Sequence, residues 1–261
     1  MRAVGEDLKA ATYGSLDILT RRRGLRRTIN GETFRFPSRW ARYYPDPYEA
    51  DKFRFLTAHC HPGGLAIDVG AHIGLFTVLM GRRVGLSGHV LSFEPTPSLG
   101  AVLSETVRLN GLTKTVEVRP EAVAGASGNT TLHASPSPGS NRNSLISDST
   151  CTQQLDIKTV SLDDVLDGEM RRVDCIKIDA EGAELWILDG AMAAIRAARP
   201  ALTIEIHPAV LRRSMSEPGE AWQRLDELGM EIFHGSERVG ENWFQEQAGP
   251  FEVTALPRGW S

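Results

Sequence analysis

The chain has 261 residues, 41% of them hydrophobic and 24% charged, which is the composition of an ordinary globular protein. This length suits one large domain with a smaller addition. A formal net charge of −4 gives no electrostatic reason to expect a nucleic-acid partner. The three cysteines are widely spaced and form no C-x-x-C pair, so neither a disulfide framework nor a zinc site is expected.

The N-terminal part carries the one local excess of charge. Residues 21–27 include five arginines, which we interpret as a solvated basic surface; the alternative is a contact for an anionic substrate or carrier. The first residues lack the apolar core of a signal peptide, and no stretch approaches the roughly 20 apolar residues of a membrane span. We therefore expect a cytoplasmic protein without a membrane span.

We expect residues 1–48 to form an extension to a main domain of residues 49–261. Within the extension, residues 7–20 predict a helix, and the alternation in Glu32–Phe36 predicts a short strand. Residues 39–47 are rich in aromatic residues and proline, and we interpret them as a lid that folds back over a binding site. The main domain then opens with a predicted helix at residues 49–59, which has Phe53, Leu56 and Cys60 on one face.

Residues 66–76 predict a strand, a tight turn and the start of a helix. An apolar run contains Asp68 and leads into Gly70 and Gly74. Glycine tolerates a positive φ and lets the backbone come close to a ligand. A dinucleotide-binding turn would need another glycine two residues after Gly70, where this chain has His72. The turn therefore favours a cofactor without a pyrophosphate, and S-adenosylmethionine (AdoMet) fits that description.

A second acid supports a nucleotide-type cofactor. His89–Phe93 predicts a strand that ends in Glu94 and Pro95, and Glu94 follows Gly70 by 24 residues. In doubly wound sheets an acid at this point accepts hydrogen bonds from ribose hydroxyl groups. We therefore assign Glu94 to the ribose, the alternative being a surface glutamate at a strand end.

Strands and helices continue to alternate along the chain. The first helix after the turn is expected to end at Gly81; the next begins with Thr96 as N-cap and Pro97 at its first position. Ser161 predicts the N-cap of a later short helix. Further strands are predicted at residues 115–119, Val173–Ile178, Ala201–Ile206, Met230–His234 and residues 251–256. Such alternation indicates right-handed crossovers and a mostly parallel sheet.

Four motifs, taken together and in this order, resemble those of the FkbM-type methyltransferases. They are residues 68–74, the Phe-Glu-Pro of residues 93–95, the Lys-Ile-Asp-Ala-Glu-Gly-Ala-Glu of residues 177–184 and the Glu-Ile-His of residues 205–207. The resemblance spans roughly residues 49–210. It implies an α/β protein of the Rossmann-like class I methyltransferase fold, with a mostly parallel seven-stranded sheet in order 3-2-1-4-5-7-6 and helices on both faces.

Candidate cofactor-binding residues follow from these motifs. Asp68 is expected to orient the turn and the AdoMet ammonium group, and the backbone from Gly70 to His72 to face the methionine part. Glu121 and Ala122 are placed to border the adenine, although Ala122 in the core is the alternative. The full set is Asp68, Gly70, Ala71, His72, Gly74, Glu94, Pro95, Glu121, Ala122 and Asp179.

Candidate catalytic residues lie where the later strands end. Methyl transfer requires in-line positioning and, for a hydroxyl acceptor, removal of a proton. We assign alignment of the reactants to Asp179 and the general base to His207, which shares a strand side with Glu205. Glu181 is a further catalytic candidate. Glu181 and Glu184 share a helix face, and the alternative is that both complement a helix dipole.

The acceptor is expected to meet Asn143, Ser144 and Glu205. The resemblance places the counterpart of Asn143–Ser144 beside the active site, in the turn-rich residues 136–144; a linker between two strands is the alternative. Asp179 with Glu205 or His207 offers ligands for Mg²⁺ or Mn²⁺, but no compact ligand cluster is evident, so no required metal is expected. The partner is a small-molecule or carrier-bound acceptor, and a homodimer is left open.

The sequence therefore predicts O-methylation of a hydroxyl group on a sugar or polyketide-type natural product, as the family favours. Methylation of a carboxylate or a peptide amide nitrogen is the alternative on the same fold. An NAD(P)-dependent oxidoreductase is disfavoured by His72 and by the lack of a Tyr-x-x-x-Lys pair. A non-catalytic AdoMet-binding protein is disfavoured by Asp179, Glu181 and His207 beside the cofactor motif.

Overall fold

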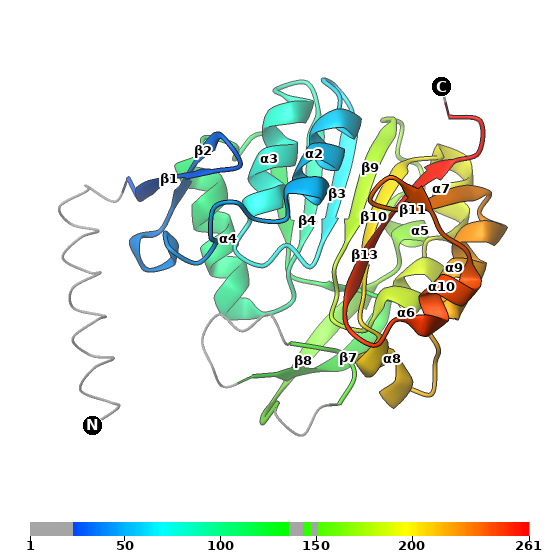
Figure 1. Cartoon of the computed structure of the whole chain (residues 1–261). Coiled ribbons are helices and arrows are strands. Elements are labelled where there is room, and N and C mark those ends of the chain that lie inside the picture. Colours follow the sequence, from blue (N-terminus) through cyan, green and yellow to red (C-terminus); the bar gives the residue numbers. More distant parts are fainter. Residues whose placement is uncertain (1–22, 136–142, 148–150, 261) are drawn as a thin grey trace.

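The computed structural model describes residues 23–135, 143–147 and 151–260. An eight-stranded sheet forms its centre, in the order β12-β11-β13-β10-β9-β3-β4-β5 (Figure 1). The strands are β3 (Leu65–Val69), β4 (His89–Phe93), β5 (Val116–Arg119), β9 (Val173–Ile178), β10 (Ala201–Ile206), β11 (Met230–His234), β12 (Glu237–Arg238) and β13 (Phe251–Pro257). The predicted order is confirmed, and the two-residue edge strand β12 adds an eighth member to the seven that were expected.

Strand direction also agrees with the predicted fold class. The register is parallel across β5, β4, β3, β9 and β10, whereas β13 runs antiparallel to both β10 and β11. All parallel strands therefore end at the same edge of the sheet, which is where an open α/β sheet binds its ligand.

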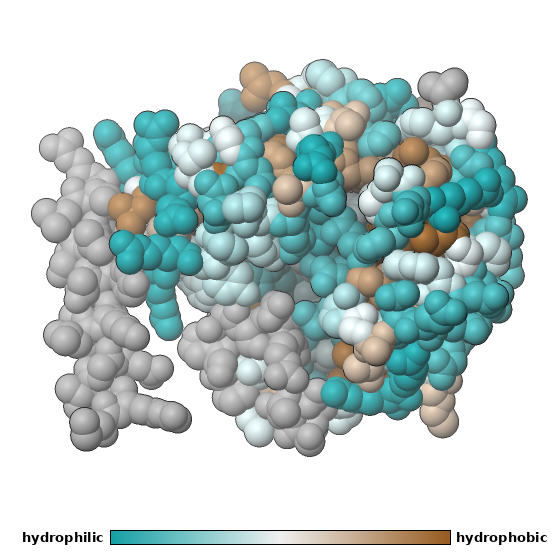
Figure 2. Space-filling view, viewed as in Figure 1, coloured by the Kyte–Doolittle hydropathy of each residue, from teal (hydrophilic) through white to brown (hydrophobic). Residues whose placement is uncertain are grey.

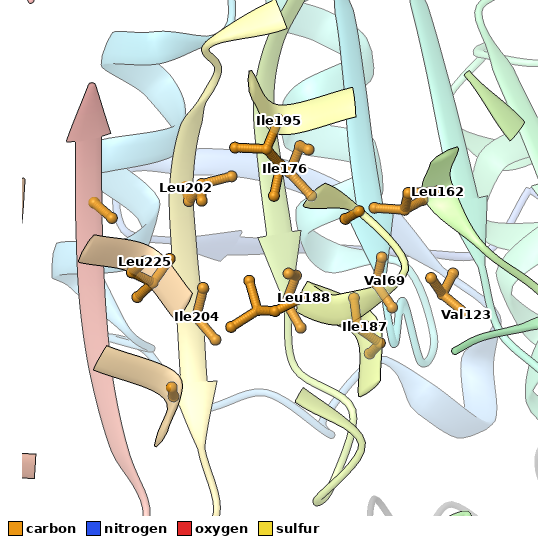
Figure 3. Close-up of a cluster of buried hydrophobic side chains, with 14 of the residues drawn as sticks. Val69, Val123, Leu162, Ile176, Ile187, Leu188, Ile195, Leu202, Ile204 and Leu225 are labelled. Carbon is orange, nitrogen blue, oxygen red and sulfur yellow. The ribbon is translucent and has the colours of Figure 1, made fainter. Parts of the chain in front are cut away.

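Helices cover both faces of this sheet, because its central strands are apolar on both sides. One hydrophobic cluster joins the sheet to α2 (Ala50–His59), α3 (Leu75–Val84) and α4 (Pro97–Leu109). The other, part of which is drawn in Figure 3, joins it to helices of the second half of the chain. These are α5 (Leu162–Val165), α6 (Glu184–Asp189), α7 (Met192–Ala198), α8 (Pro208–Arg213), α9 (Gly219–Glu227) and α10 (Glu241–Glu246).

The predicted helix ends are confirmed in two cases and wrong in one. Pro97 starts α4 directly after Thr96, and the Ser161 hydroxyl accepts a hydrogen bond from the Asp164 amide at the start of α5. Helix α3, however, runs past Gly81 to Val84. Gly81 is buried in the helix, and an added Cβ there would lie 3.1 Å from side chains packed against it, so this glycine serves close packing rather than termination.

The N-terminal extension contributes a hairpin of β1 (Leu25–Ile29) and β2 (Glu32–Phe36), followed by the short helix η1 (Ser38–Trp40). The predicted strand at Glu32–Phe36 is thus confirmed. The aromatic side chains Phe34 and Phe36 are buried in the same cluster as α3 and α4. The predicted helix at residues 7–20 and residues 21 and 22 of the basic cluster lie outside the described residues.

A second, three-stranded sheet was not predicted from the sequence. It consists of β6 (Ala122–Val123), β8 (Gln153–Val160) and β7 (Gly128–Ala134), in that order. Residues 136–142 of the turn-rich segment lie outside the described residues, but Asn143 and Ser144 follow them, and Ser144 pairs with His133 of β7. The small sheet therefore anchors these two residues.

The face shown in Figure 2 is mostly hydrophilic, and its hydrophobic residues lie in small separate groups. Among the residues that the structure describes, no helix is both long enough and apolar enough to cross a membrane.

The buried cluster in Figure 3 should dominate stability. Leu188 of α6 is 0% exposed, whereas Leu86 is 88% exposed. We expect Leu188→Ala to lower the free energy of unfolding by about 2–5 kcal/mol, because it removes buried surface and leaves a cavity. The matched control Leu86→Ala should change it by less than about 0.5 kcal/mol. Urea unfolding followed by circular dichroism measures both, and equal losses would contradict this packing.

Candidate active site

The turn after β3 has the backbone shape that its glycines predicted. Gly70, His72 and Gly74 all have positive φ angles, and the amides of Gly70 and Ala71 donate to the Phe93 carbonyl at 3.1 and 3.0 Å. A Cβ at Gly70 would lie 1.8 Å from the Asp179 carbonyl oxygen, so only glycine fits where the ends of β3 and β9 meet. Gly74 packs instead against Leu103 of α4.

A buried ion pair between Asp68 and Lys177 stabilises this turn. Asp68 is fully buried; one carboxylate oxygen accepts from the Thr77 hydroxyl at 2.6 Å and the other lies 3.1 Å from Lys177 Nζ. Lys177 also donates to the carbonyls of Gly70, at 3.1 Å, and Val69, at 3.3 Å. Burial works to lower the Lys177 pKa, but Asp68 and Asp179 outweigh it and raise that pKa. Asp68 thus contacts the turn through Lys177.

The first of two cavities lies beside Glu94 and is mainly apolar. Phe93, Leu99, Val123, Leu132 and Leu145 line it, together with Gly70, Glu94, Pro95, Thr96, Ala122, Asn143, Asp179 and Glu181. The Glu94 carboxylate accepts the amides of His72 and Thr96, each at 2.9 Å. Burial raises the Glu94 pKa, although these hydrogen bonds oppose the shift.

Glu121, which was expected to border the adenine, does not line the first cavity. Its carboxylate accepts hydrogen bonds from the Arg119 guanidinium at 3.0 and 3.1 Å.

The second cavity is aromatic and acidic. Tyr43, Tyr44, Tyr48 and Phe76 form part of its wall, with Glu49, Ala71, His72, Lys177 and Glu205. The Tyr43 and His72 rings lie 4.7 Å apart, and the Tyr44 hydroxyl is 3.5 Å from His72 Nδ1. Gly70, Asp179 and Glu181 line both cavities, which therefore adjoin at the ends of β3 and β9. The aromatic part of residues 39–47 lies at this cavity, and its action as a lid stays a prediction.

His207 lies behind Glu181. Its Nδ1 is 2.8 Å from the Glu184 carboxylate and its Nε2 is 3.5 Å from that of Glu181. Burial would lower the His207 pKa, but the hydrogen bond and charge of Glu184, with the charge of Glu181, raise it to about 9. Burial raises the Glu181 pKa to about 7, with the His207 charge opposing and the Asp179 charge assisting. His207 lines neither of the two cavities.

Glu181 itself has an unusual backbone. Its φ is +48°, a left-handed conformation that costs free energy for a residue with a side chain. The Ser144 hydroxyl donates to the Glu181 carbonyl at 2.6 Å, and the Glu184 carboxylate accepts the Gly182 amide at 2.8 Å. Asn143 lines the first cavity and donates to the Thr96 hydroxyl at 2.9 Å. The small sheet and α6 therefore fix Glu181 at the junction of the cavities.

Lys52 is the main site residue that the sequence analysis missed. It lies on α2 with only 1% of its side chain exposed, and its ammonium lies among the carboxylates of Asp179, Glu205, Glu252 and Glu49. A signal was available, because Lys52 precedes Leu56 by four residues and so shares the apolar face of the helix. Lys177 is the first residue of the motif at residues 177–184, but the sequence analysis assigned it no role in the site.

Three groups come together more closely than the sequence indicated. One ligand atom each from Asp179, Glu205 and His207 lie within 4.8 Å of one another. These are the three groups that the sequence analysis named as possible metal ligands, and the parallel register of β9 and β10 brings them together. The expectation that no metal is required stays a prediction. Two of the three groups, Asp179 and Glu205, also lie within 4.0 Å of the Lys52 ammonium.

We expect Glu184→Gln to lower the His207 pKa from about 9 toward its ordinary value of 6.5, because the variant removes the charge that raises it. The raised pKa gives stability that is fully present below about pH 6.5 and lost as pH rises through about 9. Wild type should therefore lose more stability over that range than the variant does. Titration of histidine ring protons by NMR, with urea unfolding at both pH limits, measures this.

The exposed variant Glu246→Gln is the matched control and should leave both readouts unchanged. A wild-type His207 that titrates at 6.5 would contradict the geometry described here.

Comparison with known proteins gave a family model and two curated relatives. A model of the methyltransferase FkbM domain matches residues 68–232. Methyltransferase sdnD of Sordaria araneosa is 28% identical over 170 residues, 52% of this chain and 65% of that protein. Hexuronic acid methyltransferase AglP of Haloferax volcanii is 27% identical over 164 residues, 62% of this chain and 64% of that protein. The chain thus spans just under two thirds of the length of either relative.

Among solved structures, that of Methyltransferase FkbM from Methylobacillus flagellatus KT aligns with a TM-score of 0.44 at 16% identity. The alignment covers 74% of this chain and 43% of that one.

Proposed function

The chain belongs to the FkbM methyltransferase family. We propose that it is an AdoMet-dependent methyltransferase that acts on a hydroxyl group of a sugar or a polyketide-type natural product. The observation that carries this proposal is the pair of adjoining cavities, which share Gly70, Asp179 and Glu181. One cavity is apolar with a buried acid, as an adenosine group requires, and the other is aromatic and acidic. A methyl group at their junction would face an acceptor in the second cavity.

The residues of the first cavity fit the cofactor chemically. Apolar side chains such as Phe93 and Leu132 offer surface for the adenine, and Glu94 is the acid for the ribose hydroxyl groups. Each Glu94 oxygen accepts one backbone amide and retains capacity for another donor. The backbone of Gly70 lines both cavities, so it suits the methionine part where the two cavities meet. AdoMet supplies the electrophilic methyl group; the protein supplies position, charge and proton transfer.

We propose Asp179 as the residue that aligns the reactants. Burial works to raise its pKa, but the ammonium groups of Lys177 and Lys52 lower it, so Asp179 stays ionised. An ionised carboxylate at the junction can bind the positively charged methionine end or accept a hydrogen bond from the acceptor. Ion-pair contacts to both lysines hold it there.

For the proton acceptor we prefer Glu181 to His207, which the sequence analysis had favoured. A general base works best with a pKa near the working pH, and burial brings Glu181 to about 7. Glu181 also lines both cavities. His207, with a pKa of about 9, is protonated at neutral pH and lies behind Glu181. Its charge favours the ionised form of Glu181, so we assign it the role of supporting that base.

The charge of the second cavity favours a neutral acceptor. Glu49, Asp179, Glu181 and Glu205 all line it, and its lysine, Lys177, is already paired. An acceptor carboxylate, such as that of a uronic acid, would be repelled at this point unless it faced away. A hydroxyl group carries no such penalty, and the aromatic wall offers apolar surface to a sugar or polyketide ring.

Glu94→Gln should weaken binding of S-adenosylhomocysteine, the demethylated product, about 10- to 100-fold, because hydrogen bonds to a charged group are worth roughly 1.5–3 kcal/mol. Calorimetry measures this. Glu121→Gln is the matched control, since Glu121 is paired with Arg119 and does not line the first cavity; it should change binding less than about twofold. Preferential binding of NAD(P)H without binding of AdoMet would refute the proposed cofactor site.

Glu181→Gln should lower turnover by ~10²–10⁴-fold while leaving cofactor binding nearly intact, because the proton acceptor is lost. Turnover is followed as S-adenosylhomocysteine release with an acceptor found by screening hydroxylated sugars and polyketides. Wild-type activity should rise with pH through about 7 as Glu181 ionises.

His207→Gln is the informative partner variant. It should shift this rise to higher pH, because the charge that favours ionised Glu181 is gone, and most activity should return above the shifted pKa. If His207→Gln loses as much turnover as Glu181→Gln at every pH, His207 and not Glu181 is the general base.

A further inference from the structure

The buried ammonium of Lys52 lies among four carboxylates. It lies 3.1 Å from Glu205 Oε2, 3.6 Å from Glu252 Oε2 and 3.9 Å from Asp179 Oδ2, and it also pairs with Glu49. These acids come from the start of α2, the end of β9, and strands β10 and β13. One buried cation therefore joins four separate parts of the chain.

We propose that Lys52 is a positioning residue whose ammonium serves as a built-in cation, holding Asp179 and Glu205 in place of a divalent metal ion. The proposal rests on the proposed function, since Asp179 is there the residue that aligns the reactants. It assigns to α2 a part in the active site that neither the motifs nor the family match, which begins at residue 68, includes.

The geometry makes the ammonium and a metal ion competitors. A Mg²⁺ or Mn²⁺ ion would bind carboxylate oxygens at roughly 2.0–2.2 Å, so an ion on Asp179 and Glu205 would lie within a few ångströms of the ammonium. Both would be positive at short distance, and their repulsion would oppose metal binding. Asp179 and Glu205 are two of the three groups that form the candidate cluster with His207.

Lys52 is also built to remain charged. Burial alone would favour the neutral amine, but Asp179, Glu252, Glu49 and Glu205 reverse that effect and raise the Lys52 pKa well above its ordinary value. The Phe76 ring lies 5.5 Å from the ammonium and adds a cation–π contact. Because the ammonium is part of the Lys52 side chain on α2, it cannot dissociate from the site as a bound metal ion can.

The test is Mn²⁺ binding, followed by electron paramagnetic resonance on the full chain without cofactor. Wild type should show no saturable Mn²⁺ site. Lys52→Met, of similar length but uncharged, should bind one Mn²⁺ per chain, at least about tenfold more tightly than any residual Mn²⁺ binding to wild type. Lys52→Arg keeps the charge and is the matched control, so it should resemble wild type. Adding Glu205→Gln to Lys52→Met should remove the acquired site.

A second variant protects the test against misfolding, because Lys52→Met removes the cation that four acids share. Lys52→Met/Glu49→Gln/Glu252→Gln removes the two acids outside the candidate cluster and keeps Asp179, Glu205 and His207. It should also gain the Mn²⁺ site. With an acceptor in hand, Mn²⁺ should restore part of the turnover lost in Lys52→Met and leave wild type unchanged, a rescue that a merely structural lysine would not permit.

Two results would overturn the proposal: Mn²⁺ binding to wild type as tight as to Lys52→Met, or no Mn²⁺ binding to the folded triple variant. Calorimetry with S-adenosylhomocysteine is a separate measurement. If wild type binds that ligand, the cofactor site stands whatever the Mn²⁺ experiments give. If wild type does not bind that ligand, the proposed function fails, but the Mn²⁺ experiments still test the proposal for Lys52.

Discussion

The close approach of β3 to β9 at their carboxyl ends is the constraint on which the rest of the site depends. Gly70 contacts the backbone of Asp179 at a distance that admits no side chain. The Lys177 ammonium lies next to that contact. It donates to the carbonyl of Gly70 in the turn and forms an ion pair with Asp68. Because one buried cation ties both strand ends, the backbone of Gly70 and the carboxylate of Asp179, for which we propose roles toward cofactor and acceptor, are held as one unit.

The site also concentrates negative charge, and the protein offsets that charge internally. Each of three buried cationic groups, Lys177, Lys52 and His207, contacts two or more carboxylates. Removing one partner of a buried ion pair costs more than removing a surface pair, since the remaining charge is left without water. The cationic groups therefore do more than balance charge. Their charges also shift the pKa values of the neighbouring acids. Burial raises the pKa of Glu181 and the charge of His207 opposes that shift, so the pKa is about 7.

Backbone strain falls at the same place. His72 and Glu181 have side chains yet adopt left-handed φ angles, and each flanks the junction of the two cavities. Such conformations persist only where surrounding contacts over-determine them. Here those contacts include Glu94 on the His72 amide and Ser144 on the Glu181 carbonyl. These contacts hold both residues at the wall of the second cavity.

The sequence by itself determined the alternation of strands and helices and the tight turn after β3, whereas the order of the strands in the sheet followed from the resemblance to the family. The period of apolar residues, the positions of Gly70 and Gly74, and the acids at strand ends depend on local backbone geometry, which is written in consecutive residues. The sequence predicted the start of a helix where a side chain caps it, as at Ser161, and failed at Gly81, where the glycine allows close packing against Leu112 and Val116.

Only the tertiary structure decided which charged groups meet. Lys52 lies 153 residues from Glu205 along the chain, and the pKa of His207 depends on Glu184 from another element. Such contacts depend on how strands align and how far helices pack from the sheet, so no spacing in the sequence encodes them. The roles proposed for Lys52 and Glu181, and the place of Glu121 outside the first cavity, depend on the folded arrangement, because burial and proximity, not residue type, set the charge of each group.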